Sequence, residues 1–373
     1  MPEKENILSI QQTQALCLRQ NIPFYSYRMP NEDTIYTGMQ LTETSFSFES
    51  ITALSGMQGF VLMPYCIKAD CPAIFIKEDI RFTDSLNNQE IADKLHATRF
   101  PEKERMFHSS DSEKPLYLEQ VNALISALQN GEARKAVFSR SITVQGEALQ
   151  KAPELFEKMV KCYPAAFVFL VSSPGNTVWI GATPEIFLQQ TPRTLHTMAL
   201  AGTQPVKDGQ SCGEWEYKDR EEQQIVSDYI RDILSGICPE KTNSTGPFTR
   251  KAGNVYHLCT TFECEMQPDT AKADHLRELL HPTPAVGGFP KAQALQLISR
   301  LEQHERRYYA GYLGPVRNDG TFDLFVNLRS MELYDNAYRL YAGGGITALS
   351  DAGKEWQETE IKLHTMLNLI EVH

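Results

Sequence analysis

Carboxylates on the apolar stripe of an expected helix restrict the fold of this chain more than any other feature. The sequence predicts a helix over 214–234, closed by Gly236. On it, Asp219 and Glu222 lie one turn apart, on the stripe that continues through Val226, Tyr229 and Ile233. Since an apolar stripe faces the protein interior, the fold has to provide partners for both carboxylates.

A second expected helix, near the C-terminus, repeats this pattern. It begins at residue 350 or 351, and Glu355, Glu358 and Lys362 lie at i, i+3 and i+7. The same stripe continues through the apolar residues Met366 and Leu369. The alternative is a solvent-exposed network of charges at i, i+3 and i+4 spacing.

Three consecutive glycines, Gly343, Gly344 and Gly345, separate this helix from the β-like run before it. Without Cβ atoms, successive backbone N–H groups can turn toward one anion and form a binding nest. A flexible turn after a strand has the same sequence signature. We therefore interpret the triplet as a glycine loop that either binds an anion or only connects two elements.

The two carboxylate helices would form an oxygen-rich site if they faced each other. Mg²⁺ takes few carboxylates, keeps some of its water and often bridges to a bound substrate. These residues therefore suggest a divalent metal that holds a carboxylate or phosphate ligand beside the glycine loop.

The composition indicates an ordinary globular protein with enough material for a large core. Of 373 residues, 42% are hydrophobic and 22% are charged. The net charge of -11 disfavours nucleic acids and anionic membranes as partners, because both require a basic face. Residues 1–6 contain no apolar run, so we expect no signal peptide. The longest apolar run, 165–171, is too short to span a bilayer.

Cysteines are scattered along the chain without C-x-x-C pairs or zinc-like spacing. This distribution predicts reduced packing thiols and a cytoplasmic protein. The eight are Cys17, Cys66, Cys71, Cys162, Cys212, Cys238, Cys259 and Cys264.

Outside the two carboxylate helices, expected strands and helices alternate. Residues 1–110 contain short β-like runs over 45–48, 59–63 and 73–77 and carry no chemical motif. A polar connector over 99–115 follows. Beyond it we expect helices over 116–130, 153–163 and 291–303, strands over 135–144, 308–314 and 322–333, and a hairpin of 165–171 with 177–181 through a Ser-Ser-Pro-Gly turn.

Two ionisable residues stand at the ends of expected elements. Lys135 opens a strand, where a lysine is usually solvated. Glu185 follows a turn that Pro184 restricts, so it is either positioned by rigid backbone or exposed at the surface.

Further candidate binding features lie in the second half of the chain. Arg329 shares strand parity with Phe325 and Leu333, so it can point toward whatever that face lines and bind a carboxylate. The small residues of 197–205 permit close approach to the backbone. The Pro/Gly-rich segment 280–290 is either a binding loop or an elaborate connection.

Seven short motifs follow one another between residues 181 and 362. They are Gly181-Ala-Thr-Pro-Glu185, Leu200-Ala-Gly-Thr203, Lys218-Asp-Arg-Glu-Glu222, Leu280-His-Pro-Thr-Pro-Ala-Val-Gly-Gly288, Tyr309-Ala-Gly311, Ala342-Gly-Gly-Gly-Ile346 and Glu355-x-x-Glu-x-x-x-Lys362. Through these motifs and their order, the chain resembles the chorismate-utilising enzymes over about residues 115–373. Within that family, the ending over 355–368 is most similar to isochorismate synthases.

The resemblance implies a single large α+β domain in which antiparallel sheets flanked by helices enclose a deep site. Residues 1–110 would be an N-terminal, β-rich part of this fold, and residues 115–373 the chorismate-binding catalytic region. It also implies Mg²⁺ as cofactor and chorismate as small-molecule substrate. No obligate partner subunit is expected.

The same resemblance assigns roles to individual residues. Lys135 matches the lysine that activates water, and Glu185 the acid that protonates the departing hydroxyl. Glu222 matches a metal-ligand glutamate, with Asp219 as a support one turn before it. Glu358 and Glu355 match the corresponding pair on the other helix. Substrate-binding positions would be Ala201, Gly202, Thr203, Ala285, Tyr309, Arg329, Gly343, Gly344, Gly345 and Lys362.

Three positions distinguish the branches of the family. Amino-group-installing branches typically have glutamine at the position of Lys135, one of them uses a nucleophilic lysine at the position of Ala201, and salicylate synthases tend to have threonine at Ala285. The resemblance therefore implies an isochorismate synthase of the menaquinone or the siderophore type. A salicylate synthase and a non-catalytic chorismate-binding protein are the alternatives.

Conversion of chorismate to isochorismate moves a hydroxyl from ring C4 to C2. It therefore needs a base and an acid on separate sides of the substrate ring. A lysine acts as a base only where desolvation or a nearby cation lowers its pKa toward roughly 7–8. The acid must conversely be held protonated until it donates.

Overall fold

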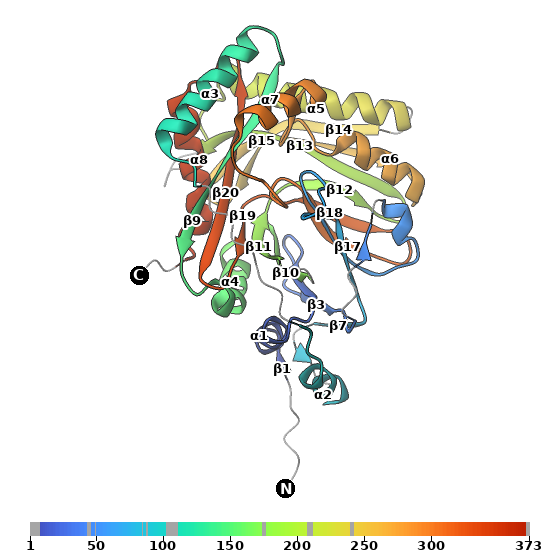
Figure 1. Cartoon of the computed structure of the whole chain (residues 1–373). Helices are drawn as coiled ribbons and strands as arrows, with labels where there is room; N and C mark the ends of the chain where they lie inside the picture. The colour runs from blue at the N-terminus through green and yellow to red at the C-terminus, as the bar shows by residue number, and fades with distance from the viewer. Residues whose placement is uncertain are drawn as a thin grey trace.

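Two antiparallel β-sheets with helices packed around them form the protein (Figure 1). The computed structural model describes residues 8–42, 46–48, 50–83, 85–86, 89–101, 111–173, 177–206, 212–238 and 242–370. Within these residues, every strand pairing is antiparallel. The expected α+β fold with antiparallel sheets flanked by helices is confirmed.

The first sheet contains nine strands, and its long central pair is β9 and β20. In spatial order it consists of β16 (Gly288–Phe289), β9 (Lys135–Gln145), β20 (Ala337–Thr347), β19 (Ser330–Leu333), β11 (Thr177–Thr183), β10 (Phe167–Ser173), β2 (Phe24–Arg28), β3 (Ile35–Met39) and β7 (Ile80–Thr83).

The second sheet also contains nine strands. Its longest strand pairings are about as long as that of β9 with β20 in the first sheet. Its order is β14 (Thr242–Ala252), β15 (Val255–Glu265), β13 (Thr194–Pro205), β12 (Ile186–Gln190), β18 (Phe322–Val326), β17 (Tyr312–Val316), β5 (Gly59–Met63), β6 (Ile74–Lys77) and β4 (Phe46–Ser47). A separate short pair joins β1 (Leu8–Ser9) to β8 (Ser85–Leu86).

Helices pack against both sheets. α4 lies against β10 and β11, α8 against β20, and α5 against β13 and β15. The helices are α1 (Ile10–Gln20), α2 (Gln89–Ala97), α3 (Lys114–Gln129), α4 (Ala148–Cys162), α5 (Tyr217–Ile237), α6 (Thr270–Leu280), α7 (Lys291–Leu301) and α8 (Ala352–Leu367), with a short 3₁₀ turn η1 at Ile51–Leu54.

The largest apolar cluster draws residues from both sheets. Phe167 of the first sheet stacks on Phe325 of the second, with ring centroids 4.1 Å apart. Tyr25 and Phe60 form a second stack between the sheets at 4.9 Å. The inner faces of the two sheets are therefore packed together by aromatic rings, each of which removes a large apolar area from water.

Most expected elements are present near their expected bounds. The three β-like runs of the N-terminal part correspond to β4, β5 and β6, and the expected hairpin is the pair β10 and β11. Residues 174–175 of its turn lie outside the described residues, as do residues 1–6 and most of the connector over 99–115. Helix α4 begins at Ala148, five residues before the expected start, and contains Pro153 in its interior. Helix α5 runs past Gly236, the expected stop, to Ile237.

The expected strand over 308–314 is wrong in its first half. Residues 307–310 form a turn in which Ala310 has φ +61°, and β17 begins only at Tyr312. The run of aromatic and small residues has the composition of a strand, but its backbone turns toward the segment after the end of β5, where the Tyr65 amide donates to the Arg307 carbonyl.

The expected strand over 322–333 is divided between the two sheets. Its first part, β18, belongs to the second sheet, and its last part, β19, to the first. Arg329 lies between them with φ +49°. The predicted parity of Arg329 with Phe325 and Leu333 is therefore wrong, because side-chain alternation holds only within one continuous strand.

The expected glycine loop is also wrong. Gly343, Gly344 and Gly345 lie inside β20 and pair with Ser139, Phe138 and Val137 of β9. None of the three has a positive φ, so they form neither a turn nor a nest. The strand continues through them to Thr347 because the neighbouring β9 supplies hydrogen-bond partners along its whole length.

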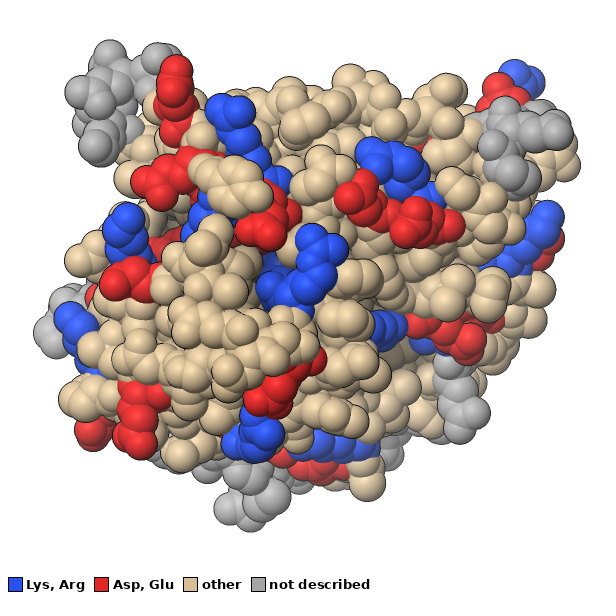
Figure 2. Space-filling view, turned by 90° about the horizontal axis from the view of Figure 1, so that it is seen from above, with Lys and Arg blue, Asp and Glu red and all other residues tan. Residues whose placement is uncertain are grey.

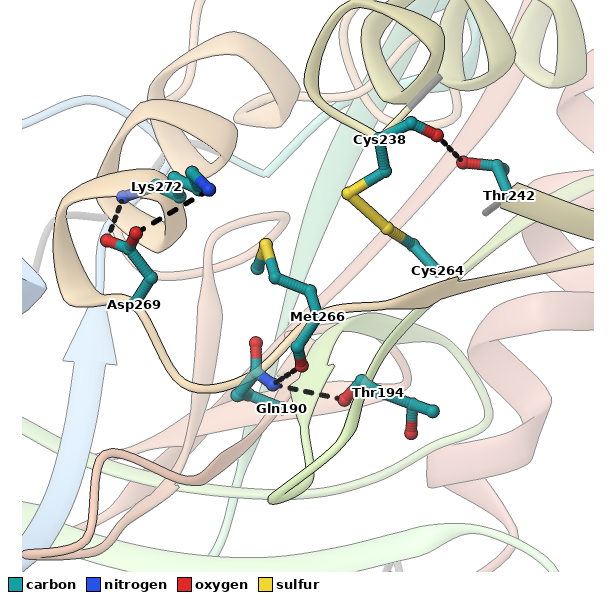
Figure 3. Close-up of a disulfide and its surroundings, with 8 residues drawn as sticks. All are labelled: Gln190, Thr194, Cys238, Thr242, Cys264, Met266, Asp269 and Lys272. Atoms are coloured by element: carbon teal, nitrogen blue, oxygen red, sulfur yellow. Dashed lines mark hydrogen bonds and ion pairs between the residues drawn. A yellow bond between two sulfur atoms is a disulfide. The ribbon is translucent and has the colours of Figure 1, made fainter. Parts of the chain in front are cut away.

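Two of the cysteines expected to be reduced are joined. Cys238, which follows α5, forms a disulfide with Cys264 of β15, with Cα atoms 6.4 Å apart (Figure 3). Their separation of 26 residues resembles no motif, and only the packing of α5 on the second sheet brings them together. The other cysteines are free: Cys17, Cys71 and Cys259 are buried, Cys66 and Cys162 exposed, and Cys212 intermediate.

Charged side chains are interspersed over the face shown in Figure 2, with larger areas of other residues between them. Neither sign of charge forms a continuous field on this face. Among the described residues, no helix is both long enough and apolar enough to cross a membrane.

Candidate active site

A central cavity collects most of the residues to which the family resemblance assigns roles. It encloses about 690 Å³ of empty space, including its open mouth. Lys135, Asp219, Gly344 and Glu355 lie beside this cavity rather than in its lining. The assigned residues in the lining are Glu185, Ala201, Gly202, Thr203, Glu222, Ala285, Tyr309, Arg329, Gly343, Gly345, Glu358 and Lys362.

Lys135 is completely buried at the start of β9. Its interpretation as a solvated strand end is wrong, because Phe289 of β16 flanks it on one side and Thr347 of β20 on the other. The Nζ atom lies 3.0 Å from Oε1 of Glu222 on α5, yet it makes no hydrogen bond to a described residue. Its N–H groups are therefore available to a water molecule or ligand.

Gly345 provides the space for this ion pair. A Cβ atom on Gly345 would lie 2.0 Å from Oε1 of Glu222 and 3.0 Å from Cε of Lys135. Both distances are shorter than a normal contact, so any larger residue would displace the pair. The third glycine of the expected loop, Gly345, thus has a packing role inside a strand.

The two glutamates of α8 that belong to the motif, Glu355 and Glu358, are paired with lysines. Glu355 is buried and forms an ion pair with Lys218 of α5. Glu358 lies 2.5 Å from Nζ of Lys362, which also donates to the carbonyl of Gly343 at 2.8 Å. Burial raises the pKa of Glu355. For Glu358, burial acts in the same direction, but Lys362 and Lys218 outweigh it and lower the pKa. The alternative of a freely exposed charge network is therefore wrong.

These carboxylates match a hard divalent cation in chemistry. Among the described residues, no group of three or more His, Cys, Asp or Glu side chains is arranged to hold a metal ion. The donors are nevertheless all oxygen atoms, as Mg²⁺ prefers. Oε2 of Glu355 is buried and accepts no hydrogen bond from any described residue, and a Cβ on Gly344 would lie 3.2 Å from it and 3.6 Å from Oε1 of Glu358. The glycine leaves that space open, and metal ligation stays a prediction.

Asp219 faces a second cavity, called here the acidic cavity, which shares Thr203 and Glu358 with the central cavity. Burial and the charge of Glu222 raise the pKa of Asp219 to about 6. The charged residues that line the acidic cavity are Glu214, Glu216, Lys218, Asp219, Asp351, Lys354, Glu355 and Glu358.

Glu185 is buried in the segment that joins β11 to β12, with 3% of its surface exposed. Its surface interpretation is wrong, because the segment is tied to β18: the carbonyl of Glu185 accepts from the amide of Val326, and the hydroxyl of Thr183 donates to the Val326 carbonyl at 2.6 Å. Burial raises the pKa of Glu185 to about 8, although Lys135 and Arg329 act in the opposite direction. The carboxyl group is therefore protonated at neutral pH.

Arg329 is held in the cavity by a neutral histidine. Burial and the charge of Arg329 lower the pKa of His257 to about 3. Nδ1 of His257 donates to the carbonyl of Gly202 at 2.7 Å, which leaves Nε2 to accept from Nη2 of Arg329 at 3.1 Å. Nη1 of Arg329 is buried and has no hydrogen-bond partner in the part of the chain that the structure describes. The guanidinium is thus oriented with one N–H edge free for an anion.

Gly202 interrupts the regular pairing of β13. The register of β13 with β15 shifts between Ala201 and Gln204, and Gly202 has φ +69°, which a residue with a side chain rarely adopts. This bulge turns the Gly202 carbonyl to His257. The small-residue segment therefore acts through backbone geometry.

Aromatic rings and a buried ion pair form another wall. The ring of Tyr309 stacks on that of Tyr341 at 5.3 Å, and burial raises the pKa of Tyr309 to about 12. Arg306 pairs with Glu302 at 2.5 Å and donates to the carbonyls of Val286 and Val137. It thereby joins the Pro/Gly-rich segment, which includes Ala285, to β9.

Four residues of this site were not singled out from the sequence for a role. His257 lies among Tyr256 and Leu258 in a strand, which is the pattern of a core histidine, and Tyr341 and Arg306 likewise have the context of structural residues. Lys218 occurs in a quoted motif, but only the approach of α5 to α8 gives it Glu355 as partner.

A family model described as chorismate binding enzyme matches residues 54–371. The isochorismate synthase EntC of Escherichia coli K12 is 32% identical over 263 residues, which cover 68% of this chain and 67% of that protein. The residues matched by the family model include every residue that lines the central cavity.

Solved structures show the same fold. A putative 2,3-dihydroxybenzoate-specific isochorismate synthase, DhbC, of Bacillus anthracis has a TM-score of 0.77 and 22% identity, covering 97% of this chain and all of that one. The menaquinone-specific isochorismate synthase MenF of Escherichia coli has a TM-score of 0.76 and 21% identity, covering 96% and 91%.

Proposed function

The chain belongs to the chorismate-binding enzyme family, and from this premise we propose that it is an isochorismate synthase, an isomerase that converts chorismate into isochorismate. The proposal is supported by curated relatives that carry this name and, above all, by one observation on the site. Lys135 and Glu185 are both buried beside the same cavity: Nζ of Lys135 has no hydrogen-bond partner among the described residues, and burial raises the pKa of the Glu185 carboxyl group to about 8, so that it can hold a proton at neutral pH.

The reaction requires these two groups. In the proposed step, water attacks ring C2 and loses a proton to the neutral amine form of Lys135, the two ring double bonds shift, and the bond between C4 and its hydroxyl breaks. Glu185 donates a proton to this hydroxyl, which leaves as water. The atoms balance, because one water is consumed and one is released, and the next turnover needs a proton to return from Lys135 to Glu185.

The substrate carries two carboxylates, and the cavity has two cationic positions for them. The free Nη1 edge of Arg329 and the hydroxyl of Tyr309 would bind one. Lys362, at the other side, would bind the second with its remaining N–H group. The separation of the two positions would align the ring between Lys135 and Glu185.

We propose that Glu222 and Glu358 hold Mg²⁺, each supported by the carboxylate one turn before it, Asp219 and Glu355. The ion would neutralise the ring carboxylate and stabilise the charge that moves through the ring. Glu222 is paired with Lys135 and Glu358 with Lys362, so these two lysines would change partner when the site is loaded.

Product analysis tests the proposal. Purified protein is incubated with chorismate, with and without Mg²⁺ and with and without ammonia, and the products are separated by chromatography. We expect an equilibrium mixture of chorismate and isochorismate that forms only with Mg²⁺ and is independent of ammonia. Salicylate with pyruvate would instead identify a salicylate synthase, and chorismate binding without any product would identify a binding protein.

A further inference from the structure

A third cavity, called here the vestibule, adjoins the central cavity at Arg329. It shares Arg329 and Pro184 with that cavity. Its walls come from the end of α4, the turn between β14 and β15, and α8. Arg329 therefore forms the boundary between an outer and an inner space.

Hydrogen bonds join the three walls of the vestibule. Asn254, in the turn between β14 and β15, donates to the carbonyl of Ile361 and accepts from the hydroxyl of Thr365, both on α8. Tyr163, at the end of α4, donates to the Thr365 carbonyl at 2.6 Å. Arg28 donates to the carbonyl of Tyr163 from the other side. The vestibule is thus a built feature of the fold rather than a gap between loose segments.

The charges that line the vestibule are positive. Among the described residues, its lining contains Arg329 and Lys251 and no aspartate or glutamate. Lys251 is exposed on β14 and has no ion pair or hydrogen bond of its side chain to a described residue. The acidic cavity at the other end of the site has six carboxylates and two lysines in its lining.

Approach to this protein is difficult for an anion. The chain has a net charge of -11, which repels a dianion at long range. A low-dielectric funnel lined by charges of one sign raises the local concentration of ions of the opposite sign. The vestibule would therefore attract anions, whereas the acidic cavity would repel them. The free edge of Arg329 stands at the inner end of that funnel.

We propose that the vestibule is the entrance for the substrate, where Lys251 attracts a small dicarboxylate and passes it to Arg329. The inference rests on the proposed function for the identity of the substrate, chorismate. It adds a direction of approach and a residue, Lys251, that touches neither the reacting ring nor a proposed metal ligand.

Cysteines inside and outside the vestibule allow the local electrostatic potential to be compared without measuring enzyme activity. Cys162 lines the vestibule, Cys212 lies next to the acidic cavity through its contact with Gln204, and Cys66 lies outside the three cavities. Three variants each keep one of these thiols and replace the other two by serine. The rate of modification by an anionic and by a cationic methanethiosulfonate is measured on each at low salt.

The ratio of anionic to cationic rate reports the local potential at the thiol. We expect this ratio at Cys162 to exceed the ratio at Cys66 by at least 5-fold, and the ratio at Cys212 to be the lowest. Lys251→Glu in the Cys162-only protein should lower its ratio at least 5-fold. Equal ratios at Cys162 and Cys66, or no effect of Lys251→Glu, would overturn the charge argument.

Blocking the vestibule tests the passage itself. A bulky, neutral maleimide is attached to each single-cysteine protein, and conversion of chorismate is measured with saturating Mg²⁺. The conjugate at Cys162 should lose at least 10-fold in kcat/KM, whereas the conjugate at Cys66 should stay within 2-fold of its unmodified protein. Full activity of the Cys162 conjugate would show that substrate takes another route.

Charge reversal provides the matched comparison. Lys251→Glu and Lys354→Glu change the net charge by the same amount, at the vestibule and at the acidic cavity respectively. At low salt, we expect the association rate constant of chorismate in stopped flow to fall about 3–10-fold for Lys251→Glu and by less than 2-fold for Lys354→Glu. The difference should vanish near 0.5 M salt, where screening shortens the range of the field. The reverse order would place the entrance at the acidic cavity.

Failure of the proposed function is distinguishable from failure of this inference. An unmodified protein that binds no chorismate and forms no product contradicts the function, while the thiol rates still decide whether the vestibule attracts anions. An active protein with uniform thiol rates contradicts the entrance alone.

Discussion

Burial favours the protonated form of the Glu185 carboxyl group. The segment between β11 and β12 is tied to β18, so the carboxyl group cannot move to water, and its pKa is raised to about 8. A general acid has to be protonated before it donates, and below pH 8 most of the Glu185 side chains are. Activity that depends on this acid is therefore present at lower pH and is lost as pH rises through about 8.

We predict this alkaline limb for kcat/KM, with a loss of about 10-fold per pH unit above 8. Glu185→Gln keeps the shape of the side chain but has no proton of suitable acidity, so kcat should fall by about 10²–10⁴-fold. Steady-state rates between pH 6 and 10 measure the first effect, and calorimetric titration with chorismate checks that binding persists. An unchanged kcat in the glutamine variant would rule out this role.

Lys135 allows a sharper test, because two substitutions separate base chemistry from charge. Lys135→Arg keeps a cation beside Glu222 but cannot deprotonate, whereas Lys135→Gln removes the cation. If Lys135 accepts the proton of water, both variants should lose about 10²–10⁴-fold in kcat while they still bind chorismate. An active arginine variant would show that only the charge is needed. Thermal unfolding of both proteins identifies any loss caused by misfolding.

Strand β20 and helices α5 and α8 act as one unit at the site. The helices bring their glutamates to the glycine triplet, and the absent Cβ atoms leave room for the carboxylates. The strand is held straight by its pairing to β9 from Ala337 to Thr347. The glutamate side chains of α5 and α8 therefore need glycines in this long strand, because larger residues would occupy their space.

Gly345→Ala is expected to disturb the site through this contact. The new Cβ would lie 2.0 Å from Oε1 of Glu222, so we predict a stability loss of about 1–3 kcal/mol and a loss of most activity. Gly236→Ala is the matched control: a Cβ there meets nothing within 4 Å, and alanine in a helix should stabilise by about 0.5–1 kcal/mol. Chemical denaturation of both variants measures the difference. Equal stabilities would contradict the packing role of Gly345.

At the scale of the whole molecule, the N-terminal part and the motif-bearing part share both sheets. Strands β2, β3 and β7 complete the first sheet, and β4, β5 and β6 the second. Residues without any recognisable motif therefore cover β10 and β17, two strands of the motif-bearing part, along their edges.

A fragment that begins at residue 115 should consequently not fold. Its strands β10 and β17 would have exposed edges, and Phe167 would lose its stack with Tyr27. We predict an aggregating protein without a cooperative thermal transition, measured by circular dichroism against the full chain. A soluble fragment with a sharp transition would mean that residues 115–373 form an independent domain.

The sequence by itself determined the element types and the family. Periodicity located α3, α5, α8, β9 and the β10–β11 hairpin within a few residues, because helices and strands bury their apolar residues with different local repeats. The motif order identified the chorismate-binding family, which the family model confirms, and most of the residues assigned from the motifs lie in the lining of the central cavity. Their chemical roles stay predictions.

Only the tertiary structure decided the surroundings of these residues. Lys135 is buried because strands from two distant segments flank it, and Arg329 stands at the crossing between two sheets rather than within a strand. The partners Lys218, His257 and Cys264 are each brought in from another element. Burial, charge pairing and pKa depend on atoms a few ångströms away in space, and local sequence repeats carry no information about which distant segment supplies them.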